Sequence, residues 1–234
     1  MTFPKFYFDR SLTFESGLHV IYGESGSGKS ALINQILELE KGQENFHLTN
    51  INRPEEFQKV FQNPDTQIIS STLGGELAFS LECRSNDQEY ISTKLASLKE
   101  KLFFECAEHR HPATLSGGEK EMLNIVTAFS VNPQLLLIDD GLSFLNVNGK
   151  QNMLGYIQNQ IVETNCIVLW LTSDCNDLQF GKTQWELSLS SFNEWNGNIS
   201  TLPTVEHKSQ SNEITIACHD LFFSYNGDSD LFNA

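Results

Sequence analysis

The sequence has few basic residues, and this shortage limits the partners that the protein can bind. Lysine and arginine account for 15 of the 234 residues, against 30 aspartates and glutamates, so the net charge is −15 at pH 7. A general nucleic-acid binder, or a protein that adheres to anionic lipid, needs an excess of positive charge on one face. We therefore expect no nucleic-acid partner, and we interpret the acidity as a solvated, self-repelling surface.

Long hydrophobic runs and paired cysteines are also missing from the sequence. No apolar run approaches the roughly 18–20 residues that span a bilayer, and residues 1–5 lack a signal-peptide pattern. The five cysteines are an odd number without C-x-x-C spacing, which favours reduced cytosolic thiols over a disulfide framework or a zinc site. With a hydrophobic content of 39%, the chain can build one large α/β domain with a real core.

A glycine-rich segment between a predicted strand and a predicted helix is the strongest motif. Its residues are Gly23, Glu24, Ser25, Gly26, Ser27, Gly28, Lys29 and Ser30. They fit the P-loop pattern G-x-x-x-x-G-K-[ST]. The glycines allow positive φ, so that backbone N–H groups and the helix N-terminus can bind phosphates. Lys29 adds a positive charge for the phosphates, and Ser30 adds a hydroxyl for Mg²⁺.

Two further predicted strands end in polar side chains that can reach the same phosphates. An apolar strand over 135–138 leads into Asp139 and Asp140, and a short strand over 59–61 leads into Gln62. Ligands of open α/β sheets bind at the carboxyl ends of the strands. We expect Asp139 to hold Mg²⁺ and Asp140 to orient the attacking water. The amide of Gln62 can point to the metal or to water, although a solvated glutamine is the simpler alternative.

A second anion site is predicted about ninety residues after the first. Ser116, Gly117 and Gly118 stand before an apolar helix expected over 122–131. Two adjacent glycines at a helix start offer bare N–H groups and a positive helix end, and the serine adds a hydroxyl. The site could bind the phosphates of the same nucleotide or of one held by another domain.

The spacing of apolar residues places further elements around these motifs. We expect a strand pair over 3–22, helices over 30–40, 73–107 and 148–164, a buried strand over 166–171, and short strands over 184–202 around Gly197. The strand over 166–171 ends in the polar residues Thr172, Ser173 and Asp174.

These motifs together resemble the nucleotide-binding domain of ABC ATPases over roughly residues 5–203. The matching segments are Walker A at 23–30, the Q-loop glutamine Gln62, the signature at 115–119, Walker B at 135–139 and the D-loop at 143–146. Residues 60–67 resemble in particular the ATPases of energy-coupling factor (ECF) importers for vitamins and metal ions. The resemblance implies a P-loop NTPase (RecA-like) α/β core, an antiparallel β subdomain, and a helical signature subdomain at about 73–130.

The resemblance also implies cofactors and partners. Such domains pair head to tail around two ATP molecules, and each site joins Walker A and Walker B of one domain to the signature of the other. We therefore expect ATP and Mg²⁺, with Ser30, Gln62 and Asp139 near the metal, and a second ABC domain and an integral membrane transport subunit as partners. The protein would then lie at the cytoplasmic face of the cell membrane. No aromatic residue evidently stacks on adenine, although Tyr7 or Phe8 could substitute.

The sequence departs from the family pattern where the family hydrolyses ATP. The catalytic glutamate after Walker B is Asp140, the next proline is Gly141, and the switch histidine is Ser173. The D-loop aspartate is Asn146, and the arginine after the signature is Met122. Because a positioned base contributes about 10²–10⁴-fold in rate, we predict that ATP is held here but hydrolysed slowly. A pure ATP-binding module and a soluble ABC ATPase without a transport role remain alternatives.

The end of the sequence predicts the start of another domain. After an ABC domain at 1–205 and a polar linker at 206–212, residues 213–234 resemble the first strand of a second ABC domain, with Tyr225 as its adenine-stacking residue. In such a tandem protein the signature Ser116–Gly118 would serve the nucleotide of the second domain. One site could then be intact although the other is degenerate.

Overall fold

The computed structural model divides the chain into two units, Met1–Ile199 and Ser200–Ala234. The described residues are 6–7, 13–37, 46–47, 53–84, 87–189, 191–197, 222–224 and 230–233. In the second unit, β9 (Phe222–Ser224) and β10 (Asp230–Asn233) pair in antiparallel fashion. The predicted linker and Tyr225 lie outside the described residues, so the second ABC domain stays a prediction.

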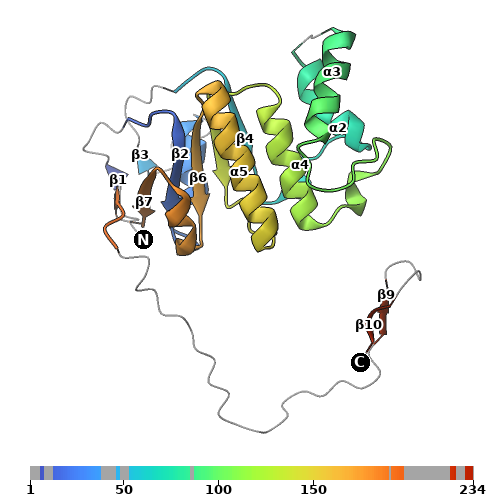
Figure 1. Ribbon diagram of the computed structural model, residues 1–234. Coiled ribbons are helices and arrows are strands. Elements are labelled where there is room, and N and C mark those ends of the chain that lie inside the picture. The colour runs from blue at the N-terminus through green and yellow to red at the C-terminus, as the bar shows by residue number, and fades with distance from the viewer. Residues whose placement is uncertain are drawn as a thin grey trace. The chain divides into compact units, whose positions relative to one another are not determined.

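A six-stranded sheet forms the centre of the first unit (Figure 1). In spatial order its strands are β4 (Phe57–Val60), β5 (Leu135–Asp139), β6 (Ile167–Thr172), β2 (Gly17–Tyr22), β7 (Thr183–Leu187) and β8 (Phe192–Glu194). Neighbouring strands are parallel except β7 and β8. The carboxyl ends of β4, β5, β6 and β2 therefore share one edge, where ligands of such sheets bind.

Helices cover both faces of the sheet, because apolar side chains of its strands point alternately to the two faces. The covering helices are α1 (Lys29–Ile36), α4 (Gly117–Phe129) and α5 (Val147–Thr164). Leu136 and Ile138 of β5 pack in a cluster with α4 and α5. Leu135 and Leu137 point to the opposite face and pack in a cluster with α1. The prediction of a fully buried strand before Asp139 is therefore confirmed.

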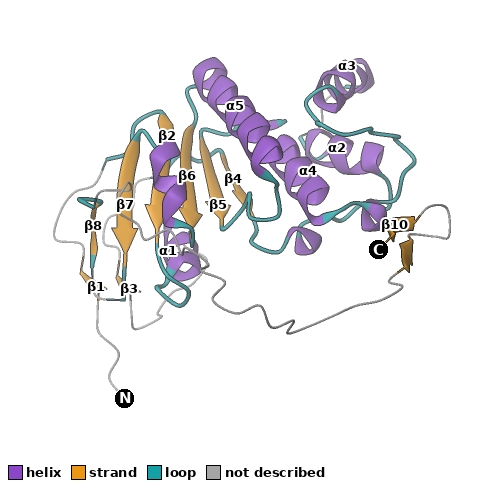
Figure 2. Cartoon of the chain, turned by 60° about the horizontal axis from the view of Figure 1, so that its bottom comes forward, coloured by secondary structure: helices purple, strands orange, loops and turns teal. Residues whose placement is uncertain are grey.

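A helical subdomain stands beyond the β4 edge of the sheet (Figure 2). Its first helices are α2 (Leu73–Glu82) and α3 (Gln88–Lys99), and α2 packs against both α3 and α4. Ile91 and Leu98 of α3 are buried, but α3 ends at Lys99, short of the predicted bound at residue 107, and Phe103 is exposed. No helix in the described part of the chain is both long enough and apolar enough to cross a membrane.

The predicted strand pair over 3–22 is wrong. β1 (Phe6–Tyr7) pairs in parallel with β3 (Phe46–His47), whereas β2 pairs with β6 and β7 inside the main sheet. A strand that is buried along nearly its whole length, as β2 is, needs hydrogen-bonded neighbours on both sides and helices on both faces. An antiparallel hairpin with β1 would have left one edge of β2 unpaired.

The short strands predicted over 184–202 are present as β7 and β8, and both of them precede Gly197. β7 and β8 pair as an antiparallel hairpin, but their turn lies at Ser188–Ser191, where the N–H of Ser188 donates to the carbonyl of Ser191 at 2.9 Å. A serine side chain supports this turn, since the Oγ atom of Ser188 accepts from the N–H of Ser191 at 3.1 Å. The predicted end of the first helix, at residue 40, lies outside the described residues.

Candidate nucleotide-binding site

The glycine-rich segment forms the loop between β2 and α1, and its glycines are required by its backbone. Gly26 and Gly28 have φ angles of 82° and 98°, in the left-handed region that favours glycine. At Gly23 a Cβ atom would lie 2.4 Å from the Oγ atom of Ser27, so no side chain fits. Gly28 is the N-cap of α1 and has no side chain to cap it. The N–H groups at the start of α1 therefore stay available to an anion, as the P-loop motif predicts.

Lys29 and Ser27 carry polar groups into the interior of this loop. The Nζ atom of Lys29 donates to the carbonyl oxygens of Gly23 and Glu24, at 2.7 and 3.2 Å, and to the Oγ atom of Ser173 at 2.9 Å. The hydroxyl of Ser27 is buried and has no hydrogen-bond partner among the described residues. A buried hydroxyl without a partner beside an ammonium group fits a phosphate oxygen as the missing partner.

Ser30 and Asp139 bring two oxygen ligands together at the start of α1 and the end of β5. The hydroxyl of Ser30 donates to Oδ1 of Asp139 at 3.3 Å. A hydroxyl and a carboxylate are oxygen donors that suit Mg²⁺, so these residues fit the predicted metal. Sequence analysis missed Lys59, whose Nζ atom lies 3.7 Å from Oδ2 of the same carboxylate. The sequence feature that could have indicated Lys59 is a lysine within a short predicted strand, between Gln58 and Val60.

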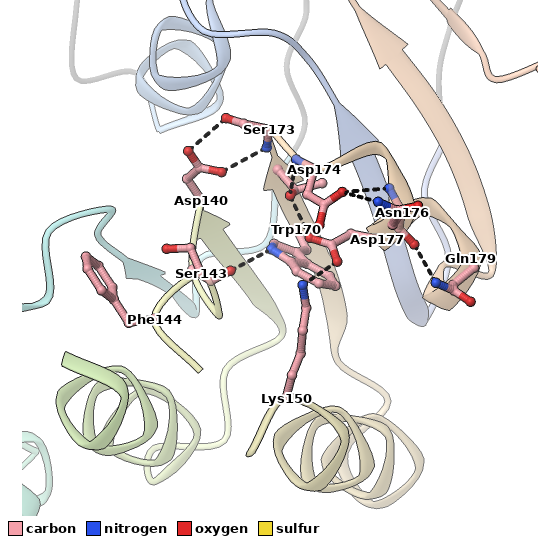
Figure 3. A network of polar contacts seen from close by, with 12 residues as sticks. Asp140, Ser143, Phe144, Lys150, Trp170, Ser173, Asp174, Asn176, Asp177 and Gln179 are labelled. Carbon is pink, nitrogen blue, oxygen red and sulfur yellow. Dashed lines mark hydrogen bonds and ion pairs between the residues drawn. The ribbon is translucent and has the colours of Figure 1, made fainter. Parts of the chain in front are cut away.

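Asp140 is held by Ser173, the residue predicted to stand in the position of the switch histidine. Its Oδ1 atom accepts from the backbone N–H of Ser173 and its Oδ2 atom from the Ser173 hydroxyl, both at 2.9 Å (Figure 3). The Nε2 atom of Gln62 also donates to Oδ2, at 3.2 Å. The structure therefore brings Lys29, Ser173, Asp140 and Gln62 into one chain of hydrogen bonds, in which both oxygens of the carboxylate are engaged.

A polar network behind this chain supports the turn after β5 (Figure 3). The indole N–H of Trp170 donates to the carbonyl of Gly141 at 3.0 Å. Lys150 lies over the Trp170 ring, 5.3 Å from its centroid, and forms an ion pair with Asp177. The hydroxyl of Thr172 donates to the same aspartate at 2.7 Å. Burial raises the pKa of Asp177, although Lys150 and Thr172 act in the opposite direction.

The signature residues lie apart from the P-loop. Ser116 is the N-cap of α4 and forms a capping box with Glu119, whose Oε2 atom accepts from the Ser116 N–H at 2.7 Å. Cβ atoms built at Gly117 and Gly118 would lie 3.1 and 3.0 Å from atoms of Phe144, so the D-loop segment packs directly on both glycines. In the described part of the chain, no hydrogen bond joins residues 116–118 to the P-loop.

Glu121 is a second residue that sequence analysis missed. It lies on α4, is 2% exposed, and accepts hydrogen bonds from the N–H groups of Ser143 and Phe144, both at 3.1 Å. Burial raises the pKa of its carboxyl to about 7, although these N–H donors act in the opposite direction. Glu121 thus ties the signature helix to the loop that begins at Asp140. The sequence feature that could have indicated the role of Glu121 is a glutamate next to the apolar residues of a predicted helix.

Comparison with known proteins decides the family. Residues 8–143 match the family model described as ABC transporter. The chain belongs to the ABC transporter family. The energy-coupling factor transporter ATP-binding protein EcfA1 of Mycoplasma capricolum is 30% identical over 187 residues, which are 75% of this chain and 46% of that protein. EcfA1 of Mesomycoplasma hyopneumoniae is 29% identical over 179 residues, which are 71% of this chain and 65% of that protein. The ABC chain thus spans about half to two thirds of the length of these relatives.

Solved structures confirm the fold of this ABC protein. CbiO1 of Clostridium perfringens, part of the ABC transporter complex cbiONQ, matches with a TM-score of 0.64 and 18% identity, over 76% of either chain. The ATP-binding subunit of another ABC transporter matches with a TM-score of 0.65 and 18% identity, over 82% of this chain and 87% of that one. The predicted P-loop NTPase architecture and the predicted likeness to ECF ATPases are both confirmed.

Proposed function

We propose that this ABC protein is the ATP-binding subunit of an importer of the energy-coupling factor type, which takes up a vitamin or a metal ion. The names of its relatives support the type of importer. The observation that carries the proposal is the approach of Lys29, Ser30 and Asp139 at one edge of the sheet. In such an importer the protein acts at the cytoplasmic face of the membrane, beside an integral membrane subunit, and pairs with a second ABC domain when ATP binds.

The P-loop would bind the phosphates of ATP with groups that the chain holds ready. The N–H groups at the start of α1 and the hydroxyl of Ser27 donate to phosphate oxygens, and the ammonium of Lys29 exchanges carbonyl partners for them. Ser30 and Asp139 would hold Mg²⁺, with the amide of Gln62 nearby on the Asp140 side. Bound Mg²⁺ supplies positive charge to the β- and γ-phosphates.

Hydrolysis at this site is expected to be slow because Asp140, in the position of the catalytic base, has a short side chain whose carboxylate oxygens already accept hydrogen bonds. An aspartate reaches one methylene less far than the glutamate of the family, and the N–H and hydroxyl of Ser173 hold both of its oxygens. Ser173 also accepts from Lys29, so it joins the base to the P-loop instead of offering an imidazole to the γ-phosphate. The site therefore favours retention of ATP over its cleavage.

Single-turnover hydrolysis of ATP bound to this chain tests the proposal. The double variant Asp140→Glu with Ser173→His restores the length of the base and removes the hydroxyl that holds it. We expect its rate to exceed that of the wild type by about 10²-fold, the contribution of one positioned base. The rate of each single variant should increase less. Asp140→Glu keeps the Ser173 hydroxyl that holds the carboxylate, and Ser173→His keeps the shorter aspartate. A wild-type rate equal to that of the double variant would refute the assignment of a degenerate site.

The transport role has its own test. Co-expression with candidate small integral membrane proteins, followed by purification, should yield a complex whose ATP turnover depends on the membrane subunit. A second candidate function is an ATP-binding module that holds a complex together, and the engaged carboxylate of Asp140 favours it for this domain taken alone. A complex that forms with ATP but turns none over would support this module, and a chain that binds no membrane protein would support a soluble ABC ATPase.

A further inference from the structure

A lysine lies beside the carboxylate that would hold Mg²⁺. The Nζ atom of Lys59 is 3.7 Å from Oδ2 of Asp139, while Ser30 donates to Oδ1 of the same group. The side chains of Lys59 and Asp139 are 13% and 7% exposed. The pair is therefore largely withdrawn from water, and neither charge is screened as it would be on the surface.

The sheet register fixes Lys59 in this place. Lys59 lies opposite Leu137 in the parallel pair of β4 and β5. Side chains alternate along a strand, so Lys59 points to the same face as Leu137 and Asp139, toward the layer that contains α1. The ring of Phe61 lies 4.9 Å from the Nζ atom and adds a cation–π contact on the outer side. A lysine in such a place is stable only with a partner charge, which Asp139 supplies.

We propose that Lys59 is a tethered cation that replaces part of the role of Mg²⁺, so that this site binds ATP with little dependence on the metal. The inference rests on the proposed ATP-binding function. Mg²⁺ gives up its hydration shell reluctantly and depends on carboxylate charge for binding. Lys59 neutralises much of that charge in advance, and a lysine ammonium is itself an established binder of phosphate.

The inference agrees with a site that holds ATP. Phosphoryl transfer uses Mg²⁺ to neutralise charge that develops during cleavage, whereas retention of ATP needs only enough positive charge near the phosphates. The ammonium of Lys29 lies on the P-loop carbonyl of Gly23, and the ammonium of Lys59 lies beside the carboxylate of Asp139 that also accepts from Ser30. In this proposal the ammonium of Lys59 supplies positive charge that Mg²⁺ would otherwise bring to the phosphates.

Calorimetric titration of the chain with ATP, in excess Mg²⁺ and again in EDTA, tests the inference. For the wild type we expect the Kd to change by less than about threefold between the two conditions. Lys59→Met removes the ammonium, so its Kd in EDTA should rise more than about tenfold over its Kd in Mg²⁺. Lys59→Arg keeps the charge and should behave as the wild type. Lys101→Met removes an exposed lysine after α3 and is the matched control for net charge.

The outcomes separate this inference from the proposed function. A wild-type Kd that rises more than about tenfold in EDTA would overturn the role of Lys59, even if Lys59→Met did not fold. ATP binding would stand in that case. Wild-type protein that fails to bind ATP in either condition would overturn the proposed function and the inference together. Equal metal dependence in Lys59→Met and Lys101→Met would also overturn the inference. A gain in Mn²⁺ affinity of the ATP complex in Lys59→Met alone would support it.

Discussion

Glu121 carries an ionisable group into the interior beside α4, where burial raises the pKa of its carboxyl from 4.5 to about 7. The N–H groups of Ser143 and Phe144 stabilise the carboxylate, but they do not offset the loss of hydration. Between pH 4.5 and about 7 the folded chain therefore holds a proton that the unfolded chain has released. Stability then falls as pH rises through this interval, because the folded state binds more protons there.

Replacing Glu121 with glutamine should remove this part of the pH dependence. The wild type should lose at most about 3 kcal/mol of unfolding free energy between the two pKa values through this one group. Glu121→Gln stays neutral at every pH and should show a flatter profile. Urea unfolding followed across the interval measures the difference. Glu163→Gln, which changes an exposed glutamate on α5, is the matched control, and equal slopes for the two variants would show that Glu121 titrates normally.

At the scale of elements, the loop after β5 is held in an unusual backbone conformation by two neighbours. Asp140 and Leu142 have φ angles of 52° and 71°. An aspartate tolerates the left-handed region, but a leucine there is strained by about 1–3 kcal/mol. Trp170 of β6 donates a hydrogen bond to the carbonyl of Gly141 in this loop. Glu121 of α4 accepts one from the N–H of Ser143. The strain therefore persists because the sheet and the signature helix both fix the segment between them.

The elements of this protein followed from the sequence more readily than their contacts. Periodicity and glycine placement predicted the P-loop, the buried strand β5 and a helix after Ser116, because each is set by local residue types, although α4 begins at Gly117 and not at Met122. The partner of β1 was missed, since strand pairing depends on segments far apart in the chain. Lys59 and Glu121 were missed for the same reason: a cation in a strand and a glutamate in a helix acquire meaning only from Asp139 and the D-loop segment.

The N-terminus of α4 gives a prediction at this scale. Ser116 caps α4, and its Oγ atom accepts from the N–H of Glu119 at 3.3 Å. Ser116→Ala should lower the unfolding free energy by about 1 kcal/mol, as the loss of an N-cap typically does. Asp87→Ala removes the corresponding cap of α3, whose side chain accepts from the N–H of Tyr90 at 2.8 Å, and should cost a similar amount. Chemical denaturation measures both. A loss above about 3 kcal/mol for Ser116→Ala alone would show that Ser116 has a larger structural role.

At the scale of the whole molecule, the predicted signature residues and the P-loop make separate sets of contacts. Ser116–Gly118 contact Glu119 and the D-loop segment, whereas Lys29 contacts Ser173 and joins the chain of hydrogen bonds that ends at Gln62. If this chain pairs with a second ABC domain, its signature completes the site of that domain. The residues Asp140 and Ser173 would then slow only the hydrolysis of the nucleotide bound on this P-loop.

If this chain pairs with a second ABC domain as proposed, ATP turnover of the paired ATPase should respond unequally to changes in the two motifs. Lys29→Ala should spare most of the turnover, because the site that it damages is the one that we propose to hydrolyse ATP slowly. Ser116→Ala should reduce turnover by about 10²-fold, the cost of losing one hydrogen-bond donor to transition-state charge. Asp87→Ala has a similar expected cost in stability but lies away from the signature, so it should keep wild-type turnover and exclude partial unfolding as the cause. Turnover that falls with Lys29→Ala and survives Ser116→Ala would mean that this P-loop, and not its signature, serves the active site.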